Sequence, residues 1–403
     1  MTPLAALADP AAGSESPPGP AEFAAMEQEL RRFVRERLRP AEPRLAAEDG
    51  VPPEILAEMR ALGLFATSLP RRHGGLGLSM EQQVRLHMEL AQASCVYRSR
   101  LSTTIGLGAQ PILHHGTEAQ QARWLPPMAA GAVTAAFGLT EPEAGSDAGA
   151  VRTVALRNGE RYVLNGIKRY ITNAPEADVF IIMARTDPAT PGPAGISAFI
   201  AERGTPGLVV GTVDVKMGQA GSHTAEVYLN ECAVPAANLI GGREGRGFKT
   251  AMQGINHARL HVAATCVGQA TRLTADALRH ALERRQFDQP IAEFQSVQNL
   301  LADCRTETYA ARAMVLETAR RWDAAGAEGD VITDIACSKL FASEMVSRVA
   351  DRCVQIHGGA GYMADYDVER LFRDVRLFRI FEGTSQIQQL LIARRMIAEA
   401  QET

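Results

Sequence analysis

The amino-acid sequence predicts an α+β fold that is mainly α, arranged as a helical domain, a small β domain and a second helical domain. Apolar residues recur at helical spacing near both ends of the chain, whereas its middle consists of short runs rich in Val, Ile, Thr and Tyr. Gly, Pro, Asn and Asp punctuate those runs at intervals typical of an antiparallel sheet. These patterns place the three domains at 21–131, 132–240 and 241–403, after a tail at 1–20.

The tail is rich in Ala, Pro, Gly and Ser and contains no Lys or Arg. This composition predicts a disordered segment rather than a targeting peptide. From Ala21 onward the pattern is helical, because Phe23, Met26, Leu30 and Phe33 share one face of a helix. Further helices of the first domain are expected at 54–64, 80–93, 99–113 and 118–125.

Short strands are expected in the β domain at 161–164, 179–183, 196–201 and 225–229, and an apolar run before Gly138 also predicts a strand. The segment 187–195 is dominated by Pro and Gly and predicts a surface loop. Helical periodicity returns at about Gly245. Long helices are expected at 250–285, 295–324, 333–357 and 385–400.

Composition excludes several classes of function. The chain has 403 residues, 46% of them hydrophobic, and a net charge of −4, so no broad basic field predicts a nucleic-acid partner. Its six cysteines are scattered without a CxxC pair or a Cys/His cluster at metal-ligand spacing, and we expect no metal site. No apolar run approaches the length of a membrane span. We therefore expect a cytoplasmic protein without a membrane partner.

Glu382 is the first candidate for a catalytic residue. It lies between the apolar pair Ile380-Phe381 and Gly383, immediately before an amphipathic helix. Apolar neighbours remove water from a carboxylate and raise its pKa, which suits a general base that takes a proton from carbon. The alternative is that Glu382 only complements the dipole of the following helix, which Thr384 or Ser385 would cap.

A second candidate segment, Gly138 to Ala150, combines glycines, hydroxyl side chains and turn-forming residues after the expected strand. Glycines let a flat ring or a diphosphate approach the main chain, and Thr140 and Ser146 offer hydroxyl donors. Alone, such a segment is usually only a turn.

The two segments together resemble the acyl-CoA dehydrogenase family. GLTEPEAGSDAGA (138–150) resembles the first signature of that family, and FEGTSQIQ (381–388) resembles its catalytic-Glu segment. NGIKRYITN (165–173), RRQF (284–287) with FQ (294–295), and QIHGGAGY (355–362) are similar to its FAD-contact segments. The resemblance spans roughly residues 21–400. It implies a central β-barrel-like domain, a C-terminal four-helix bundle, and FAD between them.

The reaction implied by the resemblance is α,β-desaturation of an acyl-CoA thioester in fatty acid metabolism. Glu382 would abstract the α-proton while the flavin accepts the β-hydride. The thioester oxygen would receive hydrogen bonds from the Glu382 backbone N–H and from a ribose hydroxyl of FAD. Electrons would pass to an electron-transfer flavoprotein. The family also implies a homotetramer, a dimer of dimers, with part of each FAD held by a neighbouring subunit.

Cofactor contacts carry over to the matching positions, with Tyr170 in place of the commoner tryptophan. Without the other motifs, Tyr170 would be interpreted as an ordinary strand residue. The expected FAD-binding residues are Phe137, Leu139, Thr140, Gly145, Ser146, Tyr170, Ile171, Thr172, Arg284, Gln286, Phe287, Gln295, Gln355, Gly358, Gly359, Thr384, Ser385 and Gln386.

Some family members carry the catalytic base on a helix, at the position that is Ala258 in this sequence. An alanine cannot take a proton, so the resemblance leaves Glu382 as the candidate base. The expected substrate-binding residues are Ser146, Arg98, Arg100, Thr103, Asn256, His257, Arg259 and Gly383. A buried Arg98 or Arg100 could bind a carboxylate or sulfinate at the far end of a short acyl group. A solvated arginine face or an intersubunit salt bridge is the alternative, as is a structural role for His257. The sequence therefore does not identify the acyl group, which could be short, branched or functionalised.

Three other classes of protein share parts of this pattern. An oxygen-using acyl-CoA oxidase would have the same motifs but turn over without an added electron acceptor. A desulfinase-type relative would lack Glu382. The third class is a flavin- or acyl-CoA-binding relative that is not a dehydrogenase. A non-enzymatic relative of this class that binds nucleic acid would carry an added basic C-terminal region, which is absent from this sequence.

Overall fold

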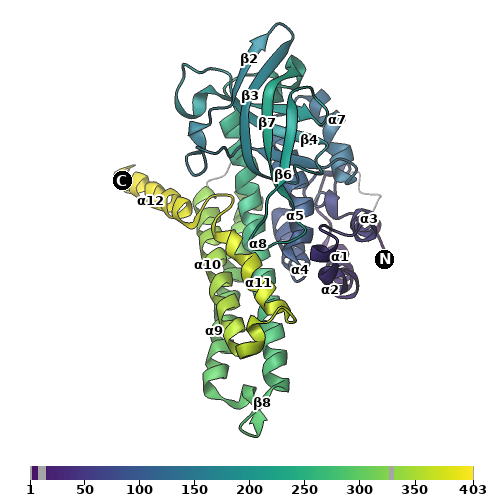
Figure 1. Cartoon of the computed structure of the whole chain (residues 1–403), viewed down its shortest axis with the longest axis vertical. Coiled ribbons are helices and arrows are strands. Elements are labelled where there is room, and N and C mark those ends of the chain that lie inside the picture. The colour runs from purple at the N-terminus through teal and green to yellow at the C-terminus, as the bar shows by residue number, and fades with distance from the viewer. Residues whose placement is uncertain (1, 8–14, 326–330, 403) are drawn as a thin grey trace.

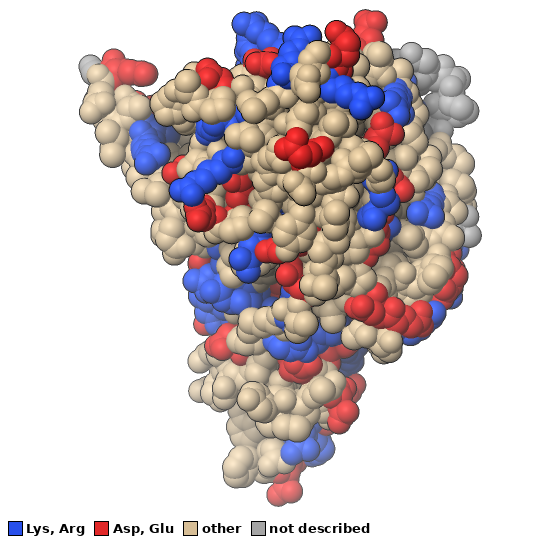
Figure 2. Space-filling view, turned by 45° about the horizontal axis from the view of Figure 1, so that its top comes forward, with Lys and Arg blue, Asp and Glu red and all other residues tan. Residues whose placement is uncertain are grey.

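The computed structural model describes residues 2–7, 15–325 and 331–402, and it places the three domains in the expected order along the chain. Figure 1 shows the sheet at one end of the molecule, long helices extending away from it, and the N-terminal helices packed beside both. None of the described helices combines the length and apolar character needed to cross a bilayer. Figure 2 shows basic and acidic side chains interspersed on the face in view.

The N-terminal domain is helical because capping residues and an apolar face coincide. Ser79 and Gln82 form a capping box at the start of one helix, and Thr117 and Gln120 form another. The buried apolar side chains of α1, α2 and α3 pack into a core of this domain, whereas α4 also contributes to the core of the C-terminal helices, and α6 and α7 pack against the sheet. The helices are α1 (Pro20–Phe33), α2 (Arg39–Ala47), α3 (Pro53–Leu62), α4 (Met80–Leu90), α5 (Cys95–Ser102), α6 (Ala109–His115) and α7 (Glu118–Ala129), with π-helical turns η2 (Val34–Leu38) and η5 (Thr103–Gly108).

The N-terminal segment differs from the disordered tail that its composition predicts. Leu4 to Leu7 form a short 3-10 helix, and Leu4 is fully buried in the core of the N-terminal domain. The Glu15 carboxylate accepts hydrogen bonds from the backbone N–H groups of Arg71 and Arg72. Residues 1 and 8–14 of the expected tail lie outside the described residues. Leu4 and the Glu15 carboxylate thus hold the described parts of this segment against the N-terminal domain.

The helix expected at 99–113 is longer and interrupted. It begins as α5, passes through the π-helical turn η5, and continues as α6. Gly108 allows this helix to contact the sheet closely, since a Cβ at Gly108 would lie 2.4 Å from the Ala135 Cβ. The Thr104 hydroxyl accepts a hydrogen bond from the Ala135 N–H at 3.1 Å. The α5–η5 segment is therefore fixed directly against the β domain.

The β domain contains one seven-stranded sheet with the order β1-β4-β2-β3-β7-β6, and β5 pairs with β4. Most pairs are antiparallel as expected, but β1 and β2 both run parallel to β4, because the chain returns through β3 before β4 begins. Side chains of β4 alternate between two cores, so both of its faces are buried. The strands are β1 (Ala135–Gly138), β2 (Val154–Asn158), β3 (Arg161–Thr172), β4 (Val179–Arg185), β5 (Ile196–Glu202), β6 (Leu208–Val213) and β7 (Thr224–Pro235).

The C-terminal domain is built on three long helices that share a core with α4. They are α8 (Gly247–Glu283), α9 (Gln295–Ala325) and α10 (Ile332–His357), and they are followed by α11 (Asp367–Val375) and α12 (Ser385–Glu402). The two-residue strands β8 (Arg285–Gln286) and β9 (Gln289–Pro290) join α8 to α9 at the tip farthest from the sheet (Figure 1). No helix was expected at α11, although Val368, Leu371, Phe372 and Val375 recur at helical spacing and three of them are buried.

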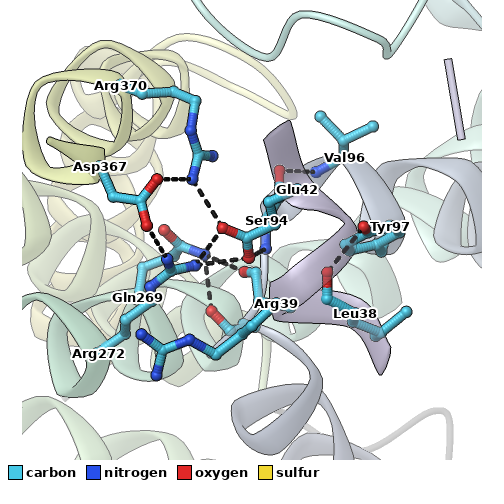
Figure 3. A network of polar contacts seen from close by, with 12 residues as sticks. Leu38, Arg39, Glu42, Ser94, Val96, Tyr97, Gln269, Arg272, Asp367 and Arg370 are labelled. Atoms are coloured by element: carbon cyan, nitrogen blue, oxygen red, sulfur yellow. Dashed lines mark hydrogen bonds and ion pairs between the residues drawn. The ribbon is translucent and has the colours of Figure 1, made fainter. Parts of the chain in front are cut away.

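Buried charges join the N-terminal domain to the bundle (Figure 3). The Glu42 carboxylate, on α2, accepts hydrogen bonds from Arg272 on α8 at 2.6 Å and from Arg370 on α11 at 2.7 Å. The same carboxylate accepts the backbone N–H of Ser94, immediately before α5, at 2.7 Å. The side chains of Glu42 and Arg272 are each 1% exposed. One carboxylate thus fixes three helices and the start of a fourth.

We expect Glu42→Leu to lower the free energy of unfolding by about 3–5 kcal/mol, because it leaves buried arginine charge without its principal partner. Chemical denaturation measures this loss. Glu58→Gln is the matched control: Glu58 pairs with Arg37, whose side chain is 47% exposed, so its removal is expected to cost at most about 1 kcal/mol. Equal effects of the two substitutions would contradict a structural role for the buried network.

Candidate active site

The turn that carries Glu382 has an unusual backbone. Glu382 adopts a left-handed conformation with φ 55°, and Gly383 follows with φ 93°. A non-glycine residue in this region is strained by about 1–3 kcal/mol and requires neighbours that hold it. Arg259 on α8 donates from Nε to the Glu382 carbonyl at 2.9 Å, and Lys339 on α10 donates from Nζ to the Gly383 carbonyl at 2.7 Å. Two bundle helices therefore hold this turn.

The Glu382 side chain is only 8% exposed, and the Arg98 guanidinium lies 3.6 Å from its Oε1. Burial raises the pKa of Glu382 above its ordinary value, while the positive charges of Arg98, Lys339 and Arg259 oppose this rise. Oε2 has no hydrogen-bond partner among the described residues. The carboxylate is thus shielded from water and has an oxygen free to accept a proton.

Lys339 was not predicted from the sequence. Its side chain is fully buried, and burial lowers its pKa to about 8, so the ammonium still carries most of its charge at neutral pH. The only signal in the sequence was a lysine inside the apolar run of the helix expected at 333–357. Its contact with a turn more than forty residues later depends on the packing of α10 against that turn.

The two candidate arginines on α5 point in different directions. Arg98 lies beside Glu382, whereas Arg100 donates to the Thr134 hydroxyl at 3.1 Å and its carbonyl accepts from Asn173 at 3.2 Å. Arg100 therefore contacts the β domain. The Thr103 hydroxyl donates back to the carbonyl of Ser99 at 3.1 Å, so it serves its own helix. Of these three expected substrate contacts, the structure brings only Arg98 to the base.

Of the other expected substrate residues, some lie next to Glu382 and others do not. Asn256 orients Arg259 by accepting from its NH1 at 2.9 Å, and Gly383 lies in the strained turn itself. His257 is buried and contacts the Gln83 side chain at 3.2 Å. Ser146 is exposed on the loop after β1. Asn256, Arg259 and Gly383 thus belong to the immediate surroundings of Glu382.

The two motifs expected to hold the flavin ring are joined by hydrogen bonds. The backbone N–H of Arg169 donates to the Thr140 carbonyl at 2.8 Å, and Lys168 donates from Nζ to Glu141 Oε1 at 2.6 Å. Burial opposes ionisation of Glu141, yet the Lys168 charge holds its pKa below the ordinary value. This buried pair fixes the 138–150 loop against β3.

The surface formed by the two motifs suits a flat ring. Tyr170 is 59% exposed at φ 59°, next to the buried Ile171, while Thr140 and Thr172 are only partly covered. A Cβ added at Gly145 would meet no atom within 4 Å, so the loop leaves open space there. Phe137 is half-buried and Leu139 is buried in the core beneath this surface. An exposed aromatic ring, hydroxyl groups and an open glycine turn together fit a flavin.

The expected FAD contacts of the bundle lie far from this surface. Arg284, Gln286 and Phe287 occupy the tip of the bundle around β8, opposite the sheet (Figure 1). At about 1.5 Å per residue, Arg284 lies about 37 Å along α8 from Arg259. The remaining bundle positions, which are exposed on the start of α9 and the end of α10, are Gln295, Gln355, Gly358 and Gly359. One subunit therefore does not bring all the expected FAD contacts together.

The three residues after the base have separate roles in this structure. The Thr384 hydroxyl accepts the Ile387 N–H at 3.3 Å and so caps α12. Ser385 is buried and donates to the Glu344 carboxylate at 2.6 Å, whereas Gln386 is exposed. The capping role foreseen for Thr384 is therefore confirmed, and Ser385 is directed toward α10.

Models of three domains of acyl-CoA dehydrogenases match this chain: the N-terminal domain at residues 20–132, the middle domain at 136–232 and the C-terminal domain at 245–397. The probable acyl-CoA dehydrogenase YngJ of Bacillus subtilis is 40% identical over 91% of this chain and 95% of its own length. The caffeyl-CoA reductase-Etf complex subunit CarC of Acetobacterium woodii is 38% identical over 86% of this chain and 90% of its own. The butyryl-CoA dehydrogenase structure from Megasphaera elsdenii matches with a TM-score of 0.88 at 35% identity, covering 93% of this chain and 98% of that one.

We expect Gly383→Ala to lower the free energy of unfolding by about 1–3 kcal/mol, because φ 93° strains an L-residue and the new Cβ would lie 2.7 Å from Gln388 Nε2 and 2.9 Å from Arg259 NH2. Denaturation measures the loss. Gly359→Ala is the control, since its Cβ would meet no atom within 4 Å. Equal stability of both variants would show that the turn is not constrained as described.

Proposed function

Because this chain belongs to the acyl-CoA dehydrogenase family, whose members are oxidoreductases that act on acyl-CoA, we propose that it desaturates an acyl-CoA thioester between the α- and β-carbons. The observation that carries the proposal is the buried Glu382 carboxylate, whose Oε2 has no partner in residues 2–7, 15–325 and 331–402. A thioester α-hydrogen is weakly acidic, so its removal requires a base of raised pKa that is held in place and shielded from water.

Glu382 would take the α-proton on its free carboxylate oxygen, and the resulting carboxyl group would be neutral. Burial favours the neutral form, and this is the direction in which the pKa of Glu382 is shifted. Arg259 and Lys339 would keep the base in position through the carbonyls of Glu382 and Gly383. Both residues donate hydrogen bonds to the backbone of the turn.

The thioester oxygen would be polarised by the backbone N–H of Glu382. Within the described part of the chain, this N–H donates no hydrogen bond, although the carbonyl of the same residue is fully engaged. A left-handed residue turns its N–H and side chain in directions that a regular helix would not allow. The strain at Glu382 would therefore place the base and an oxyanion donor on one residue.

FAD would be held by the surface of Tyr170, Thr140 and Thr172, and when bound it would supply the acceptor for the hydride from the β-carbon. The open space at Gly145 and the exposed ring of Tyr170 support this assignment. Thr140 and Thr172 would donate or accept hydrogen bonds at the ring edge. The buried Glu141–Lys168 pair would keep the two segments in register.

A second copy of the chain would complete the cofactor site. Two aromatic residues of the bundle are largely exposed to solvent: Phe287 is 86% exposed and Tyr362 is 83% exposed. The projecting helix α12 also exposes Leu390, Met396 and Ile397 (Figure 1). Exposed apolar side chains of this kind are typical of subunit interfaces. We propose that the contacts around Arg284 serve the FAD of a neighbouring subunit in a homotetramer.

An electron-transfer flavoprotein is the proposed electron acceptor. The relative CarC, 38% identical, is named as a subunit of a complex with Etf, which supports this assignment. Oxygen is the alternative acceptor. Rapid turnover in air without any added acceptor would favour an oxidase.

Glu382→Gln tests the role of the base. We expect the variant to retain bound yellow flavin and to lose roughly 10²- to 10⁴-fold in the rate at which an acyl-CoA bleaches that flavin anaerobically, since an amide cannot take the proton. Glu317→Gln, on an exposed position of α9, is the control and should react as the wild type does. Bleaching by Glu382→Gln at the wild-type rate would refute the mechanism.

The pH dependence of kcat/KM tests the electrostatics of the base. Because the base must be ionised, kcat/KM should rise with pH through a pKa above the ordinary value of 4.5. Arg98→Met removes the largest opposing charge, so the pKa of Glu382 should rise further and the midpoint should move to higher pH. Arg100→Met, which removes an arginine that contacts Thr134, should leave the midpoint in place. A midpoint that moves to lower pH in Arg98→Met would contradict the assignment.

A further inference from the structure

Three buried histidines form a cluster beside the candidate active site. His87 on α4 stacks on His261 of α8 with ring centroids 3.9 Å apart, and His257 meets His261 edge-on at 4.3 Å. The three residues are at most 5% exposed. None of the three is used by the proposed base or by the flavin surface.

The cluster adjoins Arg98 through α5. His87 Nε2 contacts the Ser102 hydroxyl at 3.3 Å, and Ser102 lies one helical turn after Arg98 on the same face. On α8, Arg259 binds the Glu382 carbonyl, and at 100° per residue Ala258 lies on the helix surface between Arg259 and His261. Arg98, which lies beside Glu382, is also near enough to His261 and His87 for its charge to lower the pKa of both imidazoles, after the larger effect of burial. About 4.5 Å of helix rise separates Ala258 from His261.

All three imidazoles are neutral at pH 7. Burial lowers the pKa of His87 to about 4 and that of His257 to about 3, and it holds the pKa of His261 well below its ordinary value. His87 must donate from Nδ1, because its partner there is the Gln83 carbonyl at 3.0 Å. Its Nε2 is then an acceptor for the Ser102 hydroxyl. His87 is thus fully satisfied within the protein.

Several polar atoms of His261, His257 and Arg98 lack hydrogen-bond partners. Both ring nitrogens of His261, Nδ1 of His257, and Nε and NH2 of Arg98 are buried without a hydrogen-bond partner in the described chain. Buried polar groups are nearly always paired in folded proteins, because an unpaired one loses its water without compensation. NH2 of Arg98 has the charge of Glu382 Oε1 at 3.6 Å, but an aliphatic acyl chain would leave the imidazole nitrogens unpaired. A group that contains oxygen could pair with several of them at once.

We propose that the acyl group bound beside Glu382 is short and carries oxygen, as a hydroxyl or carboxyl group, at its far end, and that His261 is the residue that selects it. This inference rests on the proposed function, since it takes Glu382 to be the base at the α-carbon. An imidazole offers one donor and one acceptor, which match a hydroxyl or a carboxyl oxygen. Arg98 supplies further donors and, for a carboxylate, the opposite charge.

The test compares thioesters of matched length on the purified holoenzyme: butyryl-CoA with 4-hydroxybutyryl-CoA, and pentanoyl-CoA with glutaryl-CoA. Affinities are measured by calorimetry, and reduction by anaerobic bleaching of the flavin. We expect at least one oxygenated thioester to bind at least 10-fold more tightly than its apolar counterpart. His261→Leu should abolish that preference without weakening binding of the apolar thioester. His261→Asn, which keeps a donor and an acceptor, should retain part of it.

His280→Leu is the matched control, because His280 also stacks on another histidine, His357, at 4.3 Å, but lies near the far end of α8. It should leave the preference unchanged. Arg98→Met distinguishes a terminal carboxylate from a terminal hydroxyl group. It should weaken binding of glutaryl-CoA far more than binding of 4-hydroxybutyryl-CoA.

Equal or tighter binding of both apolar thioesters, or a preference that His261→Leu leaves intact, would overturn the inference while the proposed desaturation stands. Conversely, selective binding of an oxygenated thioester without bleaching by any thioester would support the recognition and refute the proposed reaction. The binding and bleaching measurements therefore separate the two proposals.

Discussion

The buried ion pair between Glu42 and Arg272 is the interaction on which the relative placement of the helical domains depends. Its carboxylate also binds Arg370 and the Ser94 N–H at the start of α5. Arg98 follows four residues later, so the same contact that joins the N-terminal domain to the bundle sets the position of the arginine beside Glu382. A buried charge is costly unless fully paired, and this makes the arrangement specific. The site is thereby tied to the packing of the domains.

Glu382 combines two unfavourable conditions that the surrounding helices offset. Its backbone is strained at φ 55°, and its carboxylate is removed from water. Arg259 and Lys339 hold the backbone through its carbonyls, while their charges and that of Arg98 favour ionisation. The same cations therefore stabilise the turn and limit the rise of the pKa. Burial raises the pKa of Glu382 above its ordinary value, which is the direction that the proposed abstraction of a proton from carbon requires.

The polar groups beyond the base give this site its individual character. The cluster of His87, His257 and His261 lies where α4, α5 and α8 meet, and part of its hydrogen-bonding capacity is unused. Neutral imidazoles can discriminate an oxygenated acyl end from an aliphatic one without adding charge beside the base. The α5–η5 segment separates this cluster from the sheet, which Thr104 and Arg100 contact.

The sequence by itself determined the three-part order, most helices and strands, and Glu382 as the base candidate, because periodicity and short motifs are local properties. It did not reveal Lys339, the histidine cluster or the buried Leu4, nor that Arg98 and Arg100 point in different directions. Only tertiary structure decided these features. A contact between α10 and a turn more than forty residues away, or between α4 and α8, leaves no periodic trace in the chain. Burial, which sets the pKa of Glu382 and leaves His261 unpaired, likewise results from packing between segments that are distant in sequence.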